Sequence, residues 1–163
     1  MFRKNHCGNS PAIDRTTQRI ERIRLGCPSL IGLLLDTRIL LRSLLDPAQL
    51  SLRVAKALLH DGNQIWILPV STREIPLLGG KGRLNLWGDG DVHRWIEDIL
   101  SRNLFREAPL TNEVVRRMHK IDLPHRDPAV RFLAATALSF GLTLGTADAN
   151  LIRGKGYSVL ANQ

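Results

Sequence analysis

The sequence predicts an α/β protein: a three-layer α/β/α sandwich whose central sheet is mainly parallel. Short apolar segments typical of buried strands alternate along the chain with longer segments whose apolar residues recur at helical spacing. The first strand candidate, at 31–35, is a continuous apolar run, as expected of a strand covered by helices on both faces. A chain of 163 residues, 44% of them hydrophobic, can bury such a core as a single domain.

The first half of this domain alternates between the two patterns. The strands and helices expected there are, in order, strand 31–35, helix 39–45, helix 50–60, strand 65–70 and a helix through residue 78. Asp61-Gly62 ends the second helix, and Ser71 or Thr72 caps the third.

The pattern breaks at three glycines, 79, 80 and 82, and then resumes. The elements expected in the second half are helix 91–104, strand 105–109, helices 111–121 and 129–140, and strands 142–145 and 157–160. Asp127-Pro128 is a typical helix start, and Gly141 a typical helix end.

Residues 1–28 read as a poorly ordered extension, which leaves 29–163 as the folded domain. The two cysteines, Cys7 and Cys27, show no zinc-ligand spacing, which argues against a disulfide framework and a zinc site. No apolar run reaches the roughly 20 residues of a membrane span, so we expect a cytoplasmic protein with no membrane partner. The net charge of +8 favours a nucleic-acid partner.

Three acidic residues are expected at the carboxyl ends of strands. Asp36 ends the first strand, Glu74 follows the second, and Asp148 lies just after the strand at 142–145. Ligand sites of parallel sheets form outside these strand ends. Carboxylates held together repel one another unless a cation neutralises them, and Mg²⁺ prefers such oxygen ligands. The pattern therefore predicts metal-assisted hydrolysis of phosphodiester bonds, with one or two metal ions.

Five short motifs occur in an order that resembles the PIN-domain family, in its VapC toxin type. They are Leu33-Leu34-Leu35-Asp36-Thr37, Glu74-Ile75 followed by Lys81-Gly82-Arg83-Leu84, Pro124-His125-Arg126-Asp127-Pro128, Leu133-Ala134-Ala135-Thr136-Ala137 and Thr146-Ala147-Asp148. The resemblance covers residues 31 to 160. It rests on all five motifs in register, because no single one is specific.

This resemblance implies a metal-dependent endoribonuclease, using Mg²⁺ or Mn²⁺, that acts as the toxin of a toxin-antitoxin pair on structured RNA. It also implies a homodimer and a small antitoxin whose C-terminal segment covers the site. Asp36, Glu74 and Asp148 take the catalytic and metal-binding roles, and the hydroxyls of Thr37 and Thr146 support them.

The sequence departs from the family pattern at Val130. Relatives with this stretch usually read His-Arg-Asp-Pro, one residue, then Asp-Arg, and Val130 stands at the second Asp. Asp127, one helical turn earlier, is a candidate replacement ligand and equally a helix cap, and capping is the favoured interpretation. A missing carboxylate weakens metal binding, so a degenerate PIN domain that binds antitoxin or RNA without cutting it is the alternative function.

Basic residues near these motifs are candidates for RNA binding. Arg38 stands where many relatives have His or Asn, and its guanidinium would either hold an RNA phosphate or pair with Asp36. Arg126 and Arg131 are the other two candidates. The cluster Arg116, Arg117 and Lys120 has two interpretations, a solvated helix face or a phosphate-binding rim. A DNA-binding basic domain is a third functional class, and no helix-turn-helix pattern supports it.

Overall fold

Five short strands form one parallel sheet in the computed structural model, which describes residues 30–79, 91–102 and 104–163. The strands are β1 (Gly32–Leu35), β2 (Gln64–Ile67), β3 (Arg106–Glu107), β4 (Thr143–Thr146) and β5 (Ser158–Ala161). The extension predicted at 1–28, with its two cysteines, and the motif at 81–84 lie outside the described residues. The architecture below is that of Ile31–Gln163.

The strand order β3-β2-β1-β4-β5 reverses direction at β1. The chain first builds outward from β1 to β2 and β3, and then returns to place β4 and β5 on the other side. Leu35 of β1 pairs with Gly145 of β4, and the Asp36 N–H continues this pairing by donating to the Gly145 carbonyl at 3.0 Å. In parallel sheets the crevice at such a reversal is where ligands bind. It lies between the carboxyl ends of β1 and β4.

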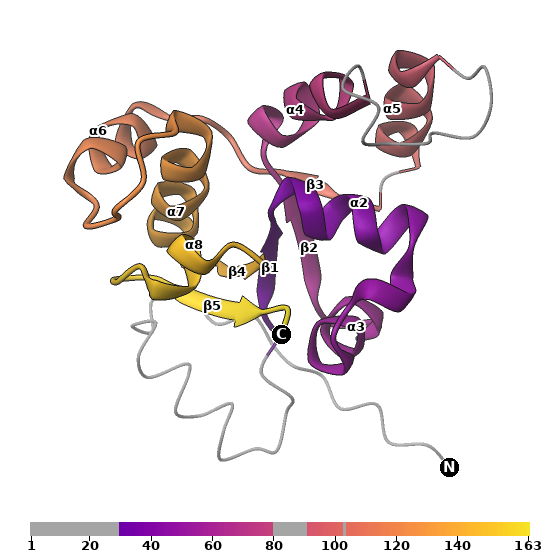
Figure 1. Ribbon diagram of the computed structural model, residues 1–163, viewed down its shortest axis with the longest axis horizontal. Helices are drawn as coiled ribbons and strands as arrows, with labels where there is room; N and C mark the ends of the chain where they lie inside the picture. The colour runs from indigo at the N-terminus through magenta and orange to yellow at the C-terminus, as the bar shows by residue number, and fades with distance from the viewer. Residues whose placement is uncertain (1–29, 80–90, 103) are drawn as a thin grey trace, which may run out of the picture. The chain divides into compact units, whose positions relative to one another are not determined.

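Helices cover both faces of the sheet (Figure 1). In chain order they are α2 (Thr37–Leu45), the 3₁₀ turn η1 (Pro47–Gln49), α3 (Leu52–Leu59), α4 (Pro69–Gly79), α5 (Val92–Ser101), α6 (Asn112–Lys120), α7 (Pro128–Phe140) and α8 (Ala149–Arg153). Alternation along β1 creates two cores. Leu34 packs with α7, α8 and the segment that follows α6, whereas Leu33 and Leu35 pack with α2, α3 and α4.

The predicted α/β/α fold is therefore confirmed, and the sheet is parallel throughout its described strands. Some predicted bounds were too wide: the strand expected at 105–109 is only Arg106–Glu107, and the helix expected at 91–104 ends at Ser101. Two further errors have a physical reason. The second strand ends at Ile67 rather than at residue 70, because Pro69 starts α4 two residues before the predicted caps. A proline suits the first position of a helix, since its fixed φ is helical and it needs no N–H partner there.

The second error is the five-residue helix α8, which was not predicted. Its single turn is too short to show helical periodicity. The other local signals held: Asp127 caps α7, and Gly141 ends it in the left-handed conformation at φ 62°. Within the described ranges no helix is long and apolar enough to cross a membrane.

Candidate functional site

Asp36 joins the end of β1 to the start of α2. Its Oδ1 accepts a hydrogen bond from the Ile39 N–H at 2.7 Å, which caps the helix, and its Oδ2 accepts one from the Thr146 hydroxyl of β4. The side chain is buried, and burial raises the pKa of this carboxyl, although the bonds from Thr146 and Ile39 oppose that rise. Asp36 is thus an acid whose ionised form needs a nearby positive charge.

Thr146 connects Asp36 to the second acid. Its Oγ1 also accepts from the Asp148 N–H at 3.0 Å, so one buried hydroxyl bonds to both segments. Asp148 caps α8, because its Oδ1 accepts from the N–H groups of Asn150 and Leu151 at 2.7 and 3.3 Å. Burial and the charge of Asp148 raise the pKa of Tyr157 to about 12, and that phenol donates to the Leu151 carbonyl. These bonds hold Asp148 at the end of β4.

Glu74 reaches the same region from α4. The buried Thr37 hydroxyl, in the first turn of α2, donates a hydrogen bond to Glu74 Oε2. This bond spans 37 residues of sequence and ties α4 to the end of β1. The supporting contacts predicted for Thr37 and Thr146 are therefore present as hydrogen bonds to two of the acids.

All three predicted acids line one cleft of about 310 Å³. Its lining is Asp36, Thr37, Arg38, Glu74, Leu77, Leu78, His125, Asp127, Val130, Leu133, Asp148 and Leu151. Four carboxylates in this lining face only one arginine and one histidine. The cleft is an acidic site bordered by leucines.

The donor atoms of the cleft suit a hard cation, because carboxylate and hydroxyl oxygens are the ligands that Mg²⁺ prefers. Among the described residues, however, no three acidic, histidine or cysteine side chains lie close enough together to hold a metal ion as a group. Mg²⁺ commonly binds through one or two carboxylates and completes its coordination with water and phosphate. The cleft therefore fits a largely hydrated cation better than one enclosed by protein ligands.

Val130, where the sequence departs from the PIN-domain pattern, and Asp127, the candidate replacement ligand, both line this cleft. Val130 lines it and packs at the same time against the core around α7. Asp127 also lines it, while its Oδ1 accepts from the Ala129 N–H at 2.9 Å. Asp127 therefore caps the helix, as expected, from a position in the cleft wall.

Comparison with known proteins adds information on the fold. No protein-family model and no curated protein matches the sequence. VapBC2 from Rickettsia felis, solved bound to a DNA fragment from its promoter, matches with a TM-score of 0.60 at 14% identity, over 80% of this chain and 98% of that one. FitAcB from Neisseria gonorrhoeae matches with a TM-score of 0.54 at 22% identity, over 80% of this chain and 97% of that one. PAE2754 from Pyrobaculum aerophilum matches with a TM-score of 0.50 at 24% identity, over 79% of this chain and 83% of that one.

The chain has a PIN-like fold. In this PIN-like domain the cleft lies where the strand order reverses, and the sequence resemblance agrees with the fold that the comparison shows.

The three arginines predicted to bind RNA differ in their positions. Arg38 is exposed and lines the cleft, whereas Arg126 is exposed outside the cleft lining. Arg131 is a correction: its guanidinium donates five hydrogen bonds, of 2.8 to 3.3 Å, to the carbonyls of Met118, Ile121, Leu123 and His125. These bonds use all of its N–H groups, so Arg131 stabilises the loop between α6 and α7 and has none left for a phosphate.

Two features of the PIN-like domain were only partly assigned from the sequence. His125 lines the cleft, and only its position beside Asp127 in the sequence indicated this. A second cleft, of about 460 Å³, is lined by Glu113, Arg116, Arg117, Lys120, Ile121 and Leu138. We name it the basic cleft.

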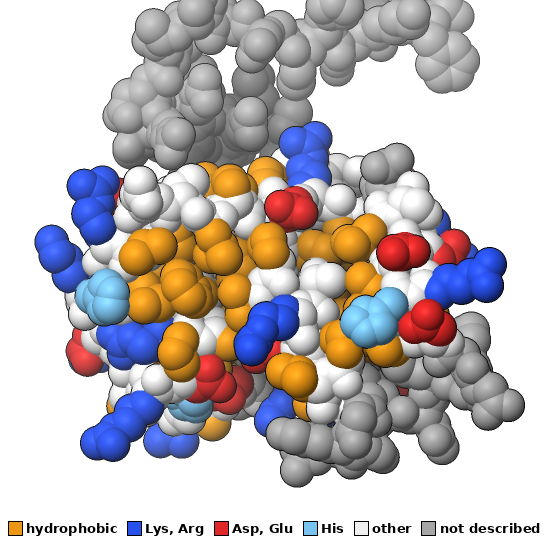
Figure 2. Space-filling view, turned by 90° about the horizontal axis from the view of Figure 1, so that it is seen from above, with side chains coloured by type: hydrophobic (Ala, Val, Ile, Leu, Met, Phe, Trp, Pro, Cys, Tyr) orange, Lys and Arg blue, Asp and Glu red, His pale blue; other side chains and the backbone are white. Residues whose placement is uncertain are grey.

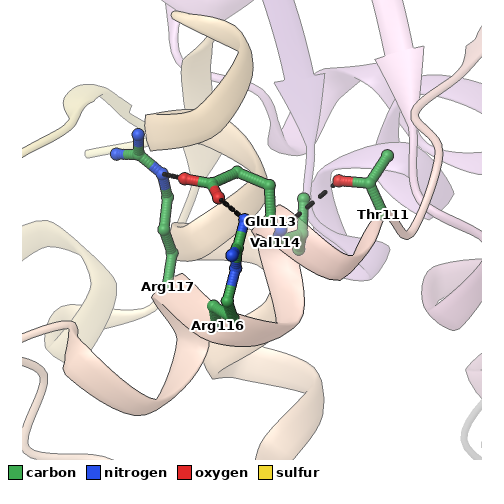
Figure 3. A network of polar contacts seen from close by, with 5 residues as sticks. All are labelled: Thr111, Glu113, Val114, Arg116 and Arg117. Atoms are coloured by element: carbon green, nitrogen blue, oxygen red, sulfur yellow. Dashed lines mark hydrogen bonds and ion pairs between the residues drawn. The ribbon is translucent and has the colours of Figure 1, made fainter.

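Figure 3 shows the polar contacts at the start of α6, the helix that supplies Glu113, Arg116 and Arg117 to the basic cleft. Thr111 caps the helix by accepting from the Val114 N–H, and Glu113 accepts from Arg116 and Arg117 at 2.6 Å each. Hydrogen bonds from Arg117, then from Arg116, lower the pKa of Glu113. Exposed ion pairs contribute little to stability. Their effect here is to orient two guanidinium groups beside one another at the cleft.

Proposed function

We propose that this protein is the toxin of a toxin-antitoxin pair and a metal-dependent endoribonuclease. One observation carries the proposal: three carboxylates from separate parts of the chain, Asp36, Glu74 and Asp148, line one cleft at the strand-order reversal of a PIN-like sheet.

The residues of the cleft divide the work of the reaction. Asp36 and Asp148 would hold the cation, with Glu74 reaching the same cleft from α4, and the hydroxyls of Thr146 and Thr37 orient Asp36 and Glu74. Bound Mg²⁺ or Mn²⁺ would supply positive charge at the scissile phosphate and a more acidic water. Arg38, at the exposed margin of the cleft, adds a second positive charge for RNA.

The surroundings of the cleft support a protein partner. Figure 2 shows hydrophobic side chains over much of the face seen from above, with charged side chains among them. Leu77, which lines the cleft, is 52% exposed. The resemblance to VapC-type toxins implies a small antitoxin, and an antitoxin segment covering the cleft would bury such leucines. A homodimer belongs to the same proposal.

Val130 supports a second candidate function. It places an isopropyl group in the cleft wall where a further acid would increase the affinity for metal. In this alternative the protein binds antitoxin or RNA without cutting RNA.

An assay for cleavage of total RNA by the purified protein, free of antitoxin, distinguishes the two candidate functions. Discrete products that need Mg²⁺ or Mn²⁺ and disappear with EDTA are expected from the nuclease. If a folded sample binds RNA but gives no products under any of these conditions, the non-cutting alternative replaces it.

Asp127→Asn tests whether Asp127 contributes to metal binding. Asparagine caps helices about as well as aspartate, so the melting temperature should stay unchanged. If the carboxylate assists the cation, cleavage should fall by about tenfold and need more Mg²⁺, since one negative charge near the metal is removed. A metal titration of cleavage measures this. If the metal titration is the same in the variant and the parent, Asp127 only caps α7 and does not contribute to metal binding.

The basic cleft is expected to bind the RNA backbone. Arg116→Ala together with Lys120→Ala should weaken RNA binding and make its dependence on salt shallower, by about 0.7 in the logarithmic slope for each phosphate that is no longer neutralised. Arg102→Ala together with Lys56→Ala is the matched control. It removes the same two charges from exposed side chains outside the basic cleft, and Arg102, like Arg116, is paired with an acid, Asp98. Binding across a salt series measures both. If RNA binding is weakened equally in the basic-cleft variant and in the control, the effect comes from net charge alone and not from the basic cleft.

A further inference from the structure

The ring of His125 has one nitrogen already in use. Its Nδ1 accepts a hydrogen bond from the Asp127 N–H at 3.1 Å. A ring nitrogen that accepts a hydrogen bond carries no proton, so the neutral imidazole holds its proton on Nε2. Because the side chain lines the acidic cleft, this makes His125 a hydrogen-bond donor there.

The backbone around His125 is held on both sides. Its N–H donates to the Leu123 carbonyl at 2.8 Å, and Arg131 donates to the carbonyls of Leu123 and His125 at 3.0 and 3.3 Å. Turning the ring to offer Nδ1 instead would break the bond to Asp127. The position and the tautomer are therefore both set before any ligand arrives.

We propose that His125 binds the RNA substrate by donating from Nε2–H to a phosphate oxygen in the cleft. The carboxylates of the cleft only accept hydrogen bonds, as phosphate oxygens do, so RNA needs donors to offset their repulsion. In the lining, Arg38 and His125 are the basic side chains. The inference rests on the proposed function for its ligand and assigns a substrate-binding residue that orients the phosphate.

Two substitutions at this position separate the roles of the ring. His125→Asn keeps an oxygen near the Nδ1 position for the Asp127 N–H but leaves nothing at Nε2. His125→Gln carries an amide out to the Nε2 position and keeps a donor there. The matched control is His60→Asn, because His60 Nδ1 accepts from the Gly62 N–H at 3.2 Å in the same local arrangement, outside the cleft.

The experiment measures binding of a stem-loop RNA to each variant in an Asp36→Asn background, and RNA cleavage in the parent background. We expect His125→Asn to weaken binding by about 10- to 100-fold, the usual effect of one hydrogen bond to a charged group. His125→Gln should retain most of the affinity, and His60→Asn all of it. Melting temperatures confirm that each variant is folded.

The outcomes also separate this inference from the proposed function. If the variants bind RNA in the expected pattern but the parent does not cleave RNA, the substrate-binding role of His125 is supported and the proposed nuclease activity is rejected. Cleavage and binding unaffected by His125→Asn would overturn the role of His125 and leave the nuclease standing. Failure of the parent to bind RNA overturns both. Nitrogen NMR of the neutral ring, at about pH 8, supports the inference if it finds Nε2–H and overturns it if it finds Nδ1–H.

Discussion

Replacing Asp36 with asparagine is expected to abolish metal-dependent RNA cleavage and, in the absence of metal, to raise the melting temperature at neutral pH. The loss of activity follows from the position of Asp36 at the strand-order reversal, where its carboxylate would hold the cation. We expect at least a 100-fold loss, which corresponds to about 2.7 kcal/mol of transition-state stabilisation.

The gain in stability follows from burial. Burial raises the pKa of Asp36 above its ordinary 3.8, so the folded protein binds this proton more tightly than the unfolded chain does. The stability of the metal-free protein therefore falls as the pH rises from 3.8 through the raised pKa. Asparagine carries no charge, and its oxygen can still accept from the Ile39 N–H.

Thermal unfolding across a pH series, with and without Mg²⁺, measures this effect. The variant should melt above the parent at neutral pH, and the difference should shrink as the pH approaches 4. Mg²⁺ should stabilise the parent more than the variant, because a ligand that binds only the folded state raises its stability. A variant that still cleaves RNA with Mg²⁺ would remove Asp36 from the proposed site.

Val130→Asp is expected to increase both metal affinity and cleavage, by about tenfold or more. The new carboxylate would enter the wall of the cleft that already holds Asp127 and Asp148. Without metal the variant should melt below the parent, because the packing of Val130 against the α7 core is removed and like charges approach one another. Metal titrations followed by melting temperature and by RNA cleavage measure the gain.

Val130→Asn is the control for this substitution, since it has nearly the same shape as aspartate without the charge. It should lower the melting temperature but leave the metal response at the parent level. An inactive parent whose Val130→Asp variant cleaves RNA would identify the natural protein as a degenerate PIN domain. If Val130→Asp changes neither metal affinity nor cleavage, the side chain at 130 does not reach the cation.

Local sequence signals predicted the elements and the positions of the acids. Asp36 follows an apolar strand, Asp127-Pro128 starts a helix, and Gly141 ends it, and each of these patterns reports on the backbone within a few residues. The predicted ends failed where two local signals competed. Apolar residues continue past Ile67 in the strand pattern, but Pro69 starts a helix there.

Interactions between distant segments could not be predicted in this way. Arg131 fits a phosphate-binding interpretation as well as a structural one until the loop of α6 and α7 surrounds its guanidinium with carbonyl groups. The bond between Thr146 and Asp36 joins residues 110 positions apart. Such interactions depend on how helices pack onto the sheet, which hydrophobic patterning specifies only by face and not by partner.

By itself, the sequence determined the order of strands and helices and which acids end them, because capping and strand patterns act through neighbouring residues. The tertiary structure alone decided which side chains surround the predicted group of acids: Val130 and His125 line the cleft with Asp36, Glu74 and Asp148, and Arg131 does not. The physical reason is that a cleft is made by packing: its lining comes from α2, α4, α7, α8 and the residues just before these helices, and only the folded chain brings them together.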